Sequence, residues 1–99
     1  MKKLTSAEIK SQLKSIPKWK VVQGKLYREF VFKDFNEAFG FMKKCARAAE
    51  AMDHHPEWTN AYKNVKVYLT THDVEGLSEL DFKLAQKMDK LLNLNSESV

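Results

Sequence analysis

The chain has 99 residues, enough for one domain with a single hydrophobic core but too few for two. Hydrophobic residues make up 43% of it and charged residues 30%, a balance typical of a globular protein and unlike that of a disordered chain. The net charge is +4, but 17 Lys and Arg residues are interleaved with 13 Asp and Glu residues, so we do not expect direct binding of nucleic acid.

The sequence also predicts the cellular compartment of the protein and the environment of its one cysteine. No apolar run approaches the roughly 20 residues that span a bilayer, and no signal-peptide core follows Met1. We therefore expect a cytoplasmic protein, with the nucleus as a second compartment. Cys45 is the only cysteine, which excludes an intrachain disulfide and a thiolate metal cluster. It lies in a helical pattern, so a core or interface position is expected.

The first predicted element is a helix that starts at Thr5 and ends before Pro17. Thr5 and Glu8 have the spacing of a capping box, in which each side chain bonds the other residue's backbone N–H. The residues that repeat on one face are Ile9, Leu13 and Ile16.

A β-hairpin is predicted next. Residues 19–22 and 26–32 are rich in aromatic and β-branched residues, and they flank a turn that contains Gly24. On the second strand, Arg28 interrupts an apolar face formed by Leu26, Phe30 and Phe32, so the division between core and solvent stays open there.

A second helix is predicted from Asp34 to about Ala51. Asp34 is the expected N-cap, and Glu37 stands at the third helical position. Apolar residues at helical spacing predict a stripe that faces the core. These residues are Phe35, Phe39, Met42, Ala46 and Ala49.

Two further strands and a last helix complete the predicted order αββαββα. Residues 58–62 and 65–71 are strand-like, and Ser78 with Asp81 repeats the helix-start signal. The apolar face of the last helix comprises Leu84, Ala85, Met88, Leu91 and Leu92. We expect an α+β fold in which three helices pack on one face of a four-stranded antiparallel sheet.

The segment His54-His55-Pro56 carries the strongest sign of chemistry. Histidine has an ordinary pKa of about 6.5, so it can give and take protons near neutral pH. Pro56 biases His55 toward extended angles, which predicts a loop or strand start after the helix. Because neighbouring residues in an extended segment point to opposite sides, the two histidines should have different roles. Glu50 and Asp53 supply carboxylates that could orient an imidazole.

The sequence resembles the pterin-4a-carbinolamine dehydratases, in particular the animal-type members. The resemblance rests on an acidic residue, three spacers, His-His-Pro, an aromatic residue, a later His and then an Asp. In this sequence the pattern comprises Glu50, His54, His55, Pro56, Tyr62, His72 and Asp81. Residues 33–42 and 76–79 are also similar to those of the family.

The resemblance implies the same α+β fold and a dehydratase acting on 4a-hydroxytetrahydrobiopterin. Loss of water would give the quinonoid dihydropterin and recycle the pterin cofactor of aromatic amino acid hydroxylases. This chemistry needs one proton delivered to the hydroxyl oxygen and one removed from a ring nitrogen, with no cofactor or metal. The resemblance implies that His54 and His72 transfer these protons and that His55 binds the pterin.

The resemblance also implies a set of residues around the substrate. Those expected to contact it are Asp53, His54, His55, Trp58, Thr70, Thr71, His72 and Asp73. Many relatives have Glu at the position of Asp73, which weakens the case for a side-chain contact there. Glu50 and Asp53 are expected to orient imidazoles. Two alternatives stay open: Asp81 is a site residue, a helix cap or both, and Trp58 lines the pocket or belongs to the core.

The sequence offers two other functions, a metal site and a protein-binding module. Three histidines invite a zinc site, but adjacent ligands on an extended segment diverge, so no metal is expected. The second functional class is a protein-binding module, because animal relatives also act as a dimerisation cofactor for a homeodomain transcription factor, through surfaces such as the second helix. The family forms dimers and tetramers, so we expect a homo-oligomer.

Overall fold

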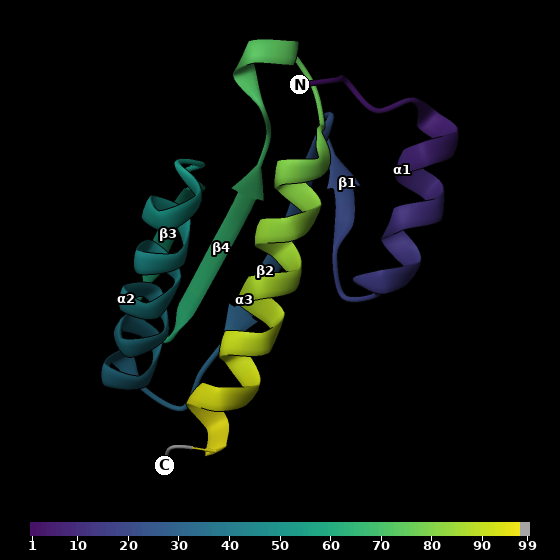
Figure 1. Cartoon of the computed structure of the whole chain (residues 1–99). Coiled ribbons are helices and arrows are strands. Elements are labelled where there is room, and N and C mark those ends of the chain that lie inside the picture. The colour runs from purple at the N-terminus through teal and green to yellow at the C-terminus, as the bar shows by residue number, and fades with distance from the viewer. Residues whose placement is uncertain (98–99) are drawn as a thin grey trace.

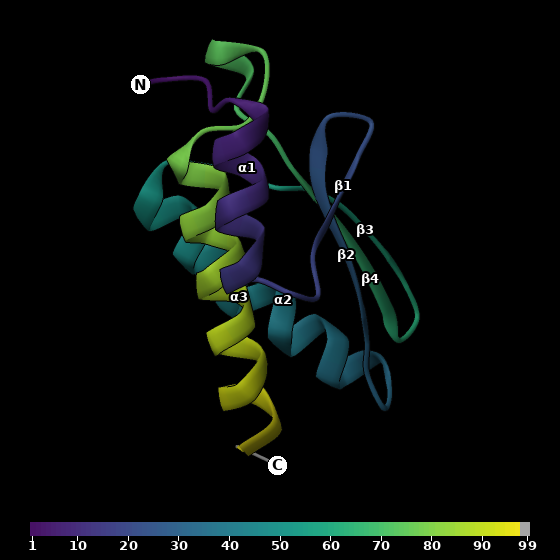
Figure 2. The same ribbon diagram turned by 90° about the vertical axis from the view of Figure 1, so that its right-hand side faces the viewer.

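The computed structural model describes residues 1–97, in which three helices lie on one face of a four-stranded antiparallel sheet (Figures 1 and 2). The predicted order αββαββα is confirmed. The elements are α1 (Ser6–Gln12), η1 (Leu13–Ser15), β1 (Lys20–Val22), β2 (Lys25–Val31), α2 (Phe35–Met52), β3 (Glu57–Ala61), β4 (Asn64–Leu69), η2 (His72–Val74) and α3 (Glu79–Glu97), where η marks a 3-10 turn. Within residues 1–97, no helix has the length and apolar character needed to cross a membrane.

The sheet has the strand order β1-β2-β4-β3. Because β4 runs antiparallel to both β2 and β3, those two strands start at the end of the sheet where β4 finishes. Glu57 at the start of β3 lies opposite Tyr68 near the end of β4. The sheet therefore brings the His-His-Pro segment and the residues that follow β4 to one end.

The strand β4 ends earlier than expected, at Leu69 rather than at Thr71. Thr71 forms an isolated bridge with Gly76, in which the Thr71 N–H donates to the Gly76 carbonyl at 2.8 Å. The chain loops out between these two residues, and His72 opens the short turn η2. Figure 1 shows this turn at the far end of the β4 arrow.

Local capping signals place the helices as predicted. Thr5 and Glu8 form the full capping box of α1, and Asp34 accepts a 2.9 Å hydrogen bond from the Glu37 N–H at the start of α2. The first helix is shorter than expected, because the chain tightens into η1 and Ile16 leaves helical angles before Pro17.

The predicted core face of α2 is only partly right: Ala49 is buried and Met42 packs against the core, but Phe35, Phe39 and Ala46 are exposed. The buried residues of this helix are Ala38, Phe41, Cys45 and Ala49. Phe35 and Phe39 are instead 46% and 48% exposed, and their rings stack on each other at 5.7 Å. Phe41 takes the core position because its ring packs against Phe30, with centroids 4.7 Å apart. Two apolar stripes overlap on this helix, and contact with the sheet selects one of them.

Arg28 lies on the helix-covered face of the sheet and has a partner on α3. Its Nη1 donates to Oδ1 of Asp89 at 2.7 Å, and its guanidinium lies 4.3 Å from the centre of the Phe30 ring. The indole N–H of Trp19 donates to the same Asp89 oxygen at 2.9 Å. Arg28, the charged residue on the otherwise apolar face of β2, is therefore neutralised by the Asp89 carboxylate of α3.

Candidate active site

The candidate site lies where α2 ends, β3 begins, β4 ends and α3 begins. Asp53 follows the last residue of α2 with left-handed angles, φ 51° and ψ 43°, which Asp and Asn tolerate better than most residues. The N–H groups of Asp53 and His54 bond back to the carbonyls of Glu50 and Ala49. This turn ends the helix and directs the His54 side chain into the protein.

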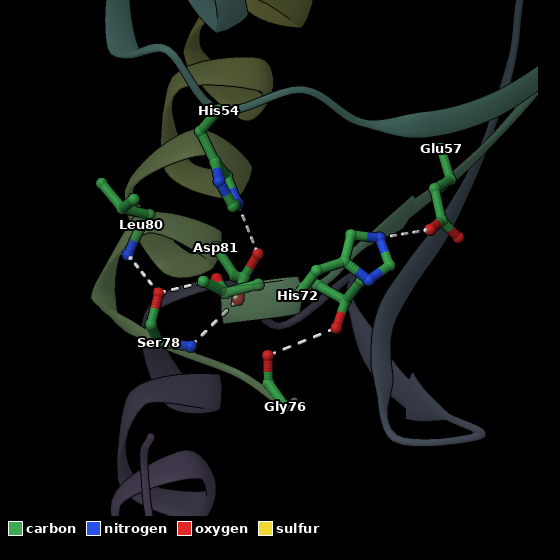
Figure 3. A network of polar contacts seen from close by, with 9 residues as sticks. His54, Glu57, His72, Gly76, Ser78, Leu80 and Asp81 are labelled. Atoms are coloured by element: carbon green, nitrogen blue, oxygen red, sulfur yellow. Dashed lines mark hydrogen bonds and ion pairs between the residues drawn. The ribbon is translucent and has the colours of Figure 1, made fainter. Parts of the chain in front are cut away.

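His54 and Asp81 form the buried centre of the site (Figure 3). The two side chains meet at 2.7 Å between Nε2 and Oδ1, with His54 8% exposed and Asp81 fully buried. The other Asp81 oxygen accepts from the Thr71 hydroxyl at 2.7 Å and from the Ser78 N–H at 2.9 Å. Because an ionised carboxylate can only accept, Nε2 of His54 carries the proton and Nδ1 keeps a free lone pair.

The direction of every hydrogen bond around Asp81 follows from this. The Thr71 hydroxyl donates its one proton to Asp81, so it can only accept from the Ser78 hydroxyl, which lies 2.7 Å away. The Ser78 oxygen in turn accepts from the Leu80 N–H at 3.3 Å. Asp81 thus contacts the backbone at the start of α3 and the His54 imidazole at the same time.

His55 faces the opposite way and is exposed. Its Nε2 lies 2.8 Å from Oε1 of Glu50. Beside this pair is a cavity of about 460 Å³, within the size range of sites for small organic ligands. Its lining residues are Ala46, Arg47, Ala49, Glu50, His55, Pro56 and Trp58. Trp58 lines this cavity and also packs against the hydrophobic core.

His72 is the most exposed of the three imidazoles and has a third carboxylate as its partner. Its Nε2 lies 3.2 Å from Oε2 of Glu57, while Oε1 of Glu57 accepts from Nζ of Lys25 at 2.6 Å. The pKa of Glu57 is lowered, mainly by the hydrogen bond from Lys25 and further by His72. Neither Glu57 nor Lys25 was predicted as a site residue. Each of the two residues begins a strand, Lys25 in β2 and Glu57 in β3. This position indicates that they meet only once the strand order is known.

Of the remaining predicted site residues, Thr70 forms a side-chain hydrogen bond, whereas Asp53 and Asp73 are exposed. The Thr70 hydroxyl donates to the Gly76 carbonyl at 3.2 Å and so braces the loop that carries His72. Asp53 and Asp73 have exposed side chains, and within residues 1–97 neither forms a side-chain hydrogen bond or ion pair. The carboxylates that contact imidazoles are therefore Glu50, Glu57 and Asp81.

Known proteins with similar sequences or folds agree on one family. The family model described as pterin 4 alpha carbinolamine dehydratase matches residues 2–91. A relative from Chelativorans sp. is 56% identical over 88% of this chain and 91% of its own length. Another from Solibacter usitatus is 53% identical over 90% of this chain and 94% of its own length. Both are provisionally named pterin-4-alpha-carbinolamine dehydratase.

A solved structure shares the fold. The crystal structure of a transcriptional coactivator/pterin dehydratase from Brucella melitensis superposes with a TM-score of 0.88 and is 46% identical. The match covers 92% of this chain and 99% of that one. Since the family model extends over nearly the whole sequence and both comparisons of full chains agree with it, this protein belongs to the pterin 4 alpha carbinolamine dehydratase family.

Proposed function

We propose that the protein removes water from 4a-hydroxytetrahydrobiopterin and releases the quinonoid dihydropterin, which recycles the pterin cofactor of aromatic amino acid hydroxylases. The observation that carries this proposal is the buried hydrogen bond between His54 and Asp81. A separate cavity, lined by the adjacent residue His55 and by Trp58 but not by His54 or His72, supplies a candidate surface for the pterin. Membership of the dehydratase family supports the same reaction.

In this mechanism, His54 and His72 handle the two protons. One imidazole, in its protonated form, delivers a proton to the 4a-hydroxyl oxygen as the carbon–oxygen bond breaks and water leaves. The other, in its neutral form, accepts the proton of the adjacent ring nitrogen, and the electron pair of that N–H forms the carbon–nitrogen double bond. Because Nε2 of His54 donates to Asp81, Nδ1 is the atom left for this exchange. The Asp81 carboxylate stabilises the imidazolium form of His54 through the same contact.

His55 and the cavity beside it serve to bind the pterin. The Trp58 ring offers a flat apolar surface to a planar heterocycle, and Glu50 holds the His55 imidazole at 2.8 Å. Thr70 and Thr71 fix the loop that carries His72, the first through Gly76 and the second through Asp81. Asp53 and Asp73 are exposed and adjoin His54 and His72 in the sequence, so they are candidates to contact the polar side chain of the substrate.

The direct test is the absorbance change as the carbinolamine decays, with and without the protein. Decay should be faster with wild-type protein, and the acceleration should be lost when His54 and His72 are both replaced by Ala. Decay at the same rate with and without wild-type protein would refute the dehydratase assignment.

We further propose that the exposed face of α2 mediates association between copies of the chain. Phe35 and Phe39 form a stacked apolar pair on this face, nearly half exposed. A transcription-factor partner is the alternative occupant, suggested by the Brucella protein, which is described as a coactivator as well as a dehydratase. Sedimentation of wild type, Phe39→Ser and the control Val31→Ser, which changes an exposed apolar residue of β2, tests the proposal. Only Phe39→Ser should lower the mass; equal masses for all three would refute it.

A further inference from the structure

We propose that Glu57, held in place by Lys25, is a positioning residue that orients the imidazole of His72. The inference rests on the proposed function in one respect, because it takes His72 to be one of the two proton-transfer groups. It adds two residues to the site, Glu57 and Lys25, that the family pattern described above does not contain.

Two contacts link the side chains of Lys25, Glu57 and His72, with Glu57 in the middle. Glu57 uses a different oxygen for each neighbour. Its Oε1 accepts from Lys25 at 2.6 Å. Its Oε2 faces Nε2 of His72 at 3.2 Å, the contact drawn in Figure 3. The two contacts therefore do not compete. The tight contact with Lys25 fixes the carboxylate, and the second oxygen is left pointing at the imidazole.

The sheet makes this arrangement possible. Lys25 is the first residue of β2 and Glu57 is the first residue of β3, with the end of β4 between them. His72 follows β4 and opens η2. Three segments that are distant in the sequence therefore converge at one end of the sheet, and Lys25 reaches across β4 to hold Glu57.

His72 needs such support more than His54 does. The His54 ring is buried and fixed by Asp81, whereas the His72 side chain is 80% exposed and sits on a turn of three residues. Its ring can rotate about two bonds, and the contact with Glu57 selects one orientation. Because the carboxylate accepts from Nε2, this orientation leaves Nδ1 for the substrate, the same nitrogen that His54 leaves free.

Steady-state kinetics test the functional part. Glu57→Ala should lower kcat about three- to tenfold with little change in KM, since an exposed charged contact contributes modestly. Glu57→Gln keeps an oxygen that can accept from Nε2, so it should lose less. Lys25→Met should lower kcat in the same direction by a smaller factor. The matched control is Glu29→Ala, which removes a carboxylate of β2 that accepts from Asn64 and does not contact a histidine.

A double-variant comparison separates positioning from a general loss of structure. If Glu57 acts through His72, Glu57→Ala should have no further effect on kcat when His72 is already Ala. An equal drop in both backgrounds, or an equal drop in Glu29→Ala, would overturn the proposal.

A second measurement does not depend on activity. The Glu57 carboxyl carbon can be followed by NMR during an acid titration. The pKa of Glu57 should rise toward its ordinary value in Lys25→Met and by a smaller amount in His72→Gln, because both partners hold it low. If the pKa of Glu57 shifts in these variants but the protein has no dehydratase activity, the proposed function is refuted and the contact between Glu57 and His72 is supported. If neither substitution changes the pKa of Glu57, the positioning role is refuted even when the enzyme is active.

Discussion

His54 donates a 2.7 Å hydrogen bond to Asp81, and this one carboxylate also accepts the N–H of the residue before helix α3. The contact that fixes the orientation of the imidazole is therefore part of the contact that starts the helix. Activity and stability should be coupled at Asp81, and they can be separated at Ser78, which contributes to the cap but does not touch His54.

Asp81→Asn should lower both the melting temperature and kcat. The three groups that donate to Asp81 would face an amide with only one acceptor oxygen, so at least one buried donor loses its partner. A buried unsatisfied group costs about 1–3 kcal/mol. The amide also fails to stabilise the imidazolium form of His54, so kcat should fall at least tenfold in the folded protein.

Ser78→Ala is the matched control for that variant. It removes the hydroxyl that accepts from Leu80 and leaves the Ser78 N–H on Asp81, so it should cost about 1 kcal/mol of stability with little change in kcat. Thermal melts and kinetics on the two variants decide the matter. Equal kcat losses would mean that the Asp81 effect comes from the helix start alone.

The three histidines should differ in which kinetic constant they affect. His54→Ala and His72→Ala should each lower kcat about 100-fold or more, because positioned acid and base groups typically contribute that much. His55→Ala should mainly raise KM, since His55 lines the cavity and does not touch the Asp81 network. The double variant of His54 and His72 should lose less than the product of the single losses.

Circular dichroism on the same histidine variants provides the check on folding. Near-normal kcat in both His54→Ala and His72→Ala would contradict the acid/base roles and favour a pterin-binding module without catalysis.

The features predicted well from the sequence are those set by neighbours along the chain. Thr5 with Glu8, and Asp34 with Glu37, are three residues apart, so the caps could be recognised from spacing alone. The core face of α2 could not, because aromatic residues occur on two overlapping stripes and only packing against the sheet decides between them. Arg28 is a similar case, since its partner Asp89 lies 61 residues away.

The candidate site divides in the same way. The loop that carries His54 and His55 followed from Pro56, and the opposed directions of the two imidazoles followed from extended geometry. The expectation that Asp81 is a site residue rested on the family resemblance, because nothing in local spacing connects it with His54, 27 residues away. Its place at the helix start could be predicted from the spacing to Ser78. Glu57 and Lys25 were missed because their contact depends on the order β2-β4-β3, which hairpin signals do not give.

Asp89→Ala should destabilise the fold strongly and leave the chemistry of the folded protein unchanged. The substitution leaves Arg28, whose side chain is only 15% exposed, without its counter-charge, and it leaves the indole N–H of Trp19 without an acceptor. Removing one partner of a largely buried pair costs about 3 kcal/mol. Lys2→Ala is the control, because the Lys2–Glu8 pair is exposed to solvent and should contribute little to stability. Urea unfolding measures both, and similar losses would contradict the structural role of Asp89.

The buried thiol of Cys45 should make the fold less stable at alkaline pH. Burial in the core, with a smaller contribution from the negative charge of Asp89, raises the pKa of the Cys45 thiol to about 12. In the unfolded chain the thiol ionises near its ordinary pKa of about 8.5, so above that pH the folded state holds a proton that the unfolded state has lost. Stability from this group is therefore complete below about pH 8.5 and declines as the pH rises toward 12, by at most about 1.4 kcal/mol per pH unit.

Cys45→Val removes the ionisable thiol while keeping an apolar side chain of similar size in the core. Urea unfolding of wild type and Cys45→Val should be measured from about pH 6 to about pH 11. The two stability curves should be parallel below about pH 8, and wild type should lose stability more steeply above it. The native thiol should also resist alkylation at pH 8 until the protein unfolds, because the reactive thiolate is suppressed. Rapid alkylation of the folded protein, or the same pH slope in both proteins, would contradict a buried and protonated Cys45.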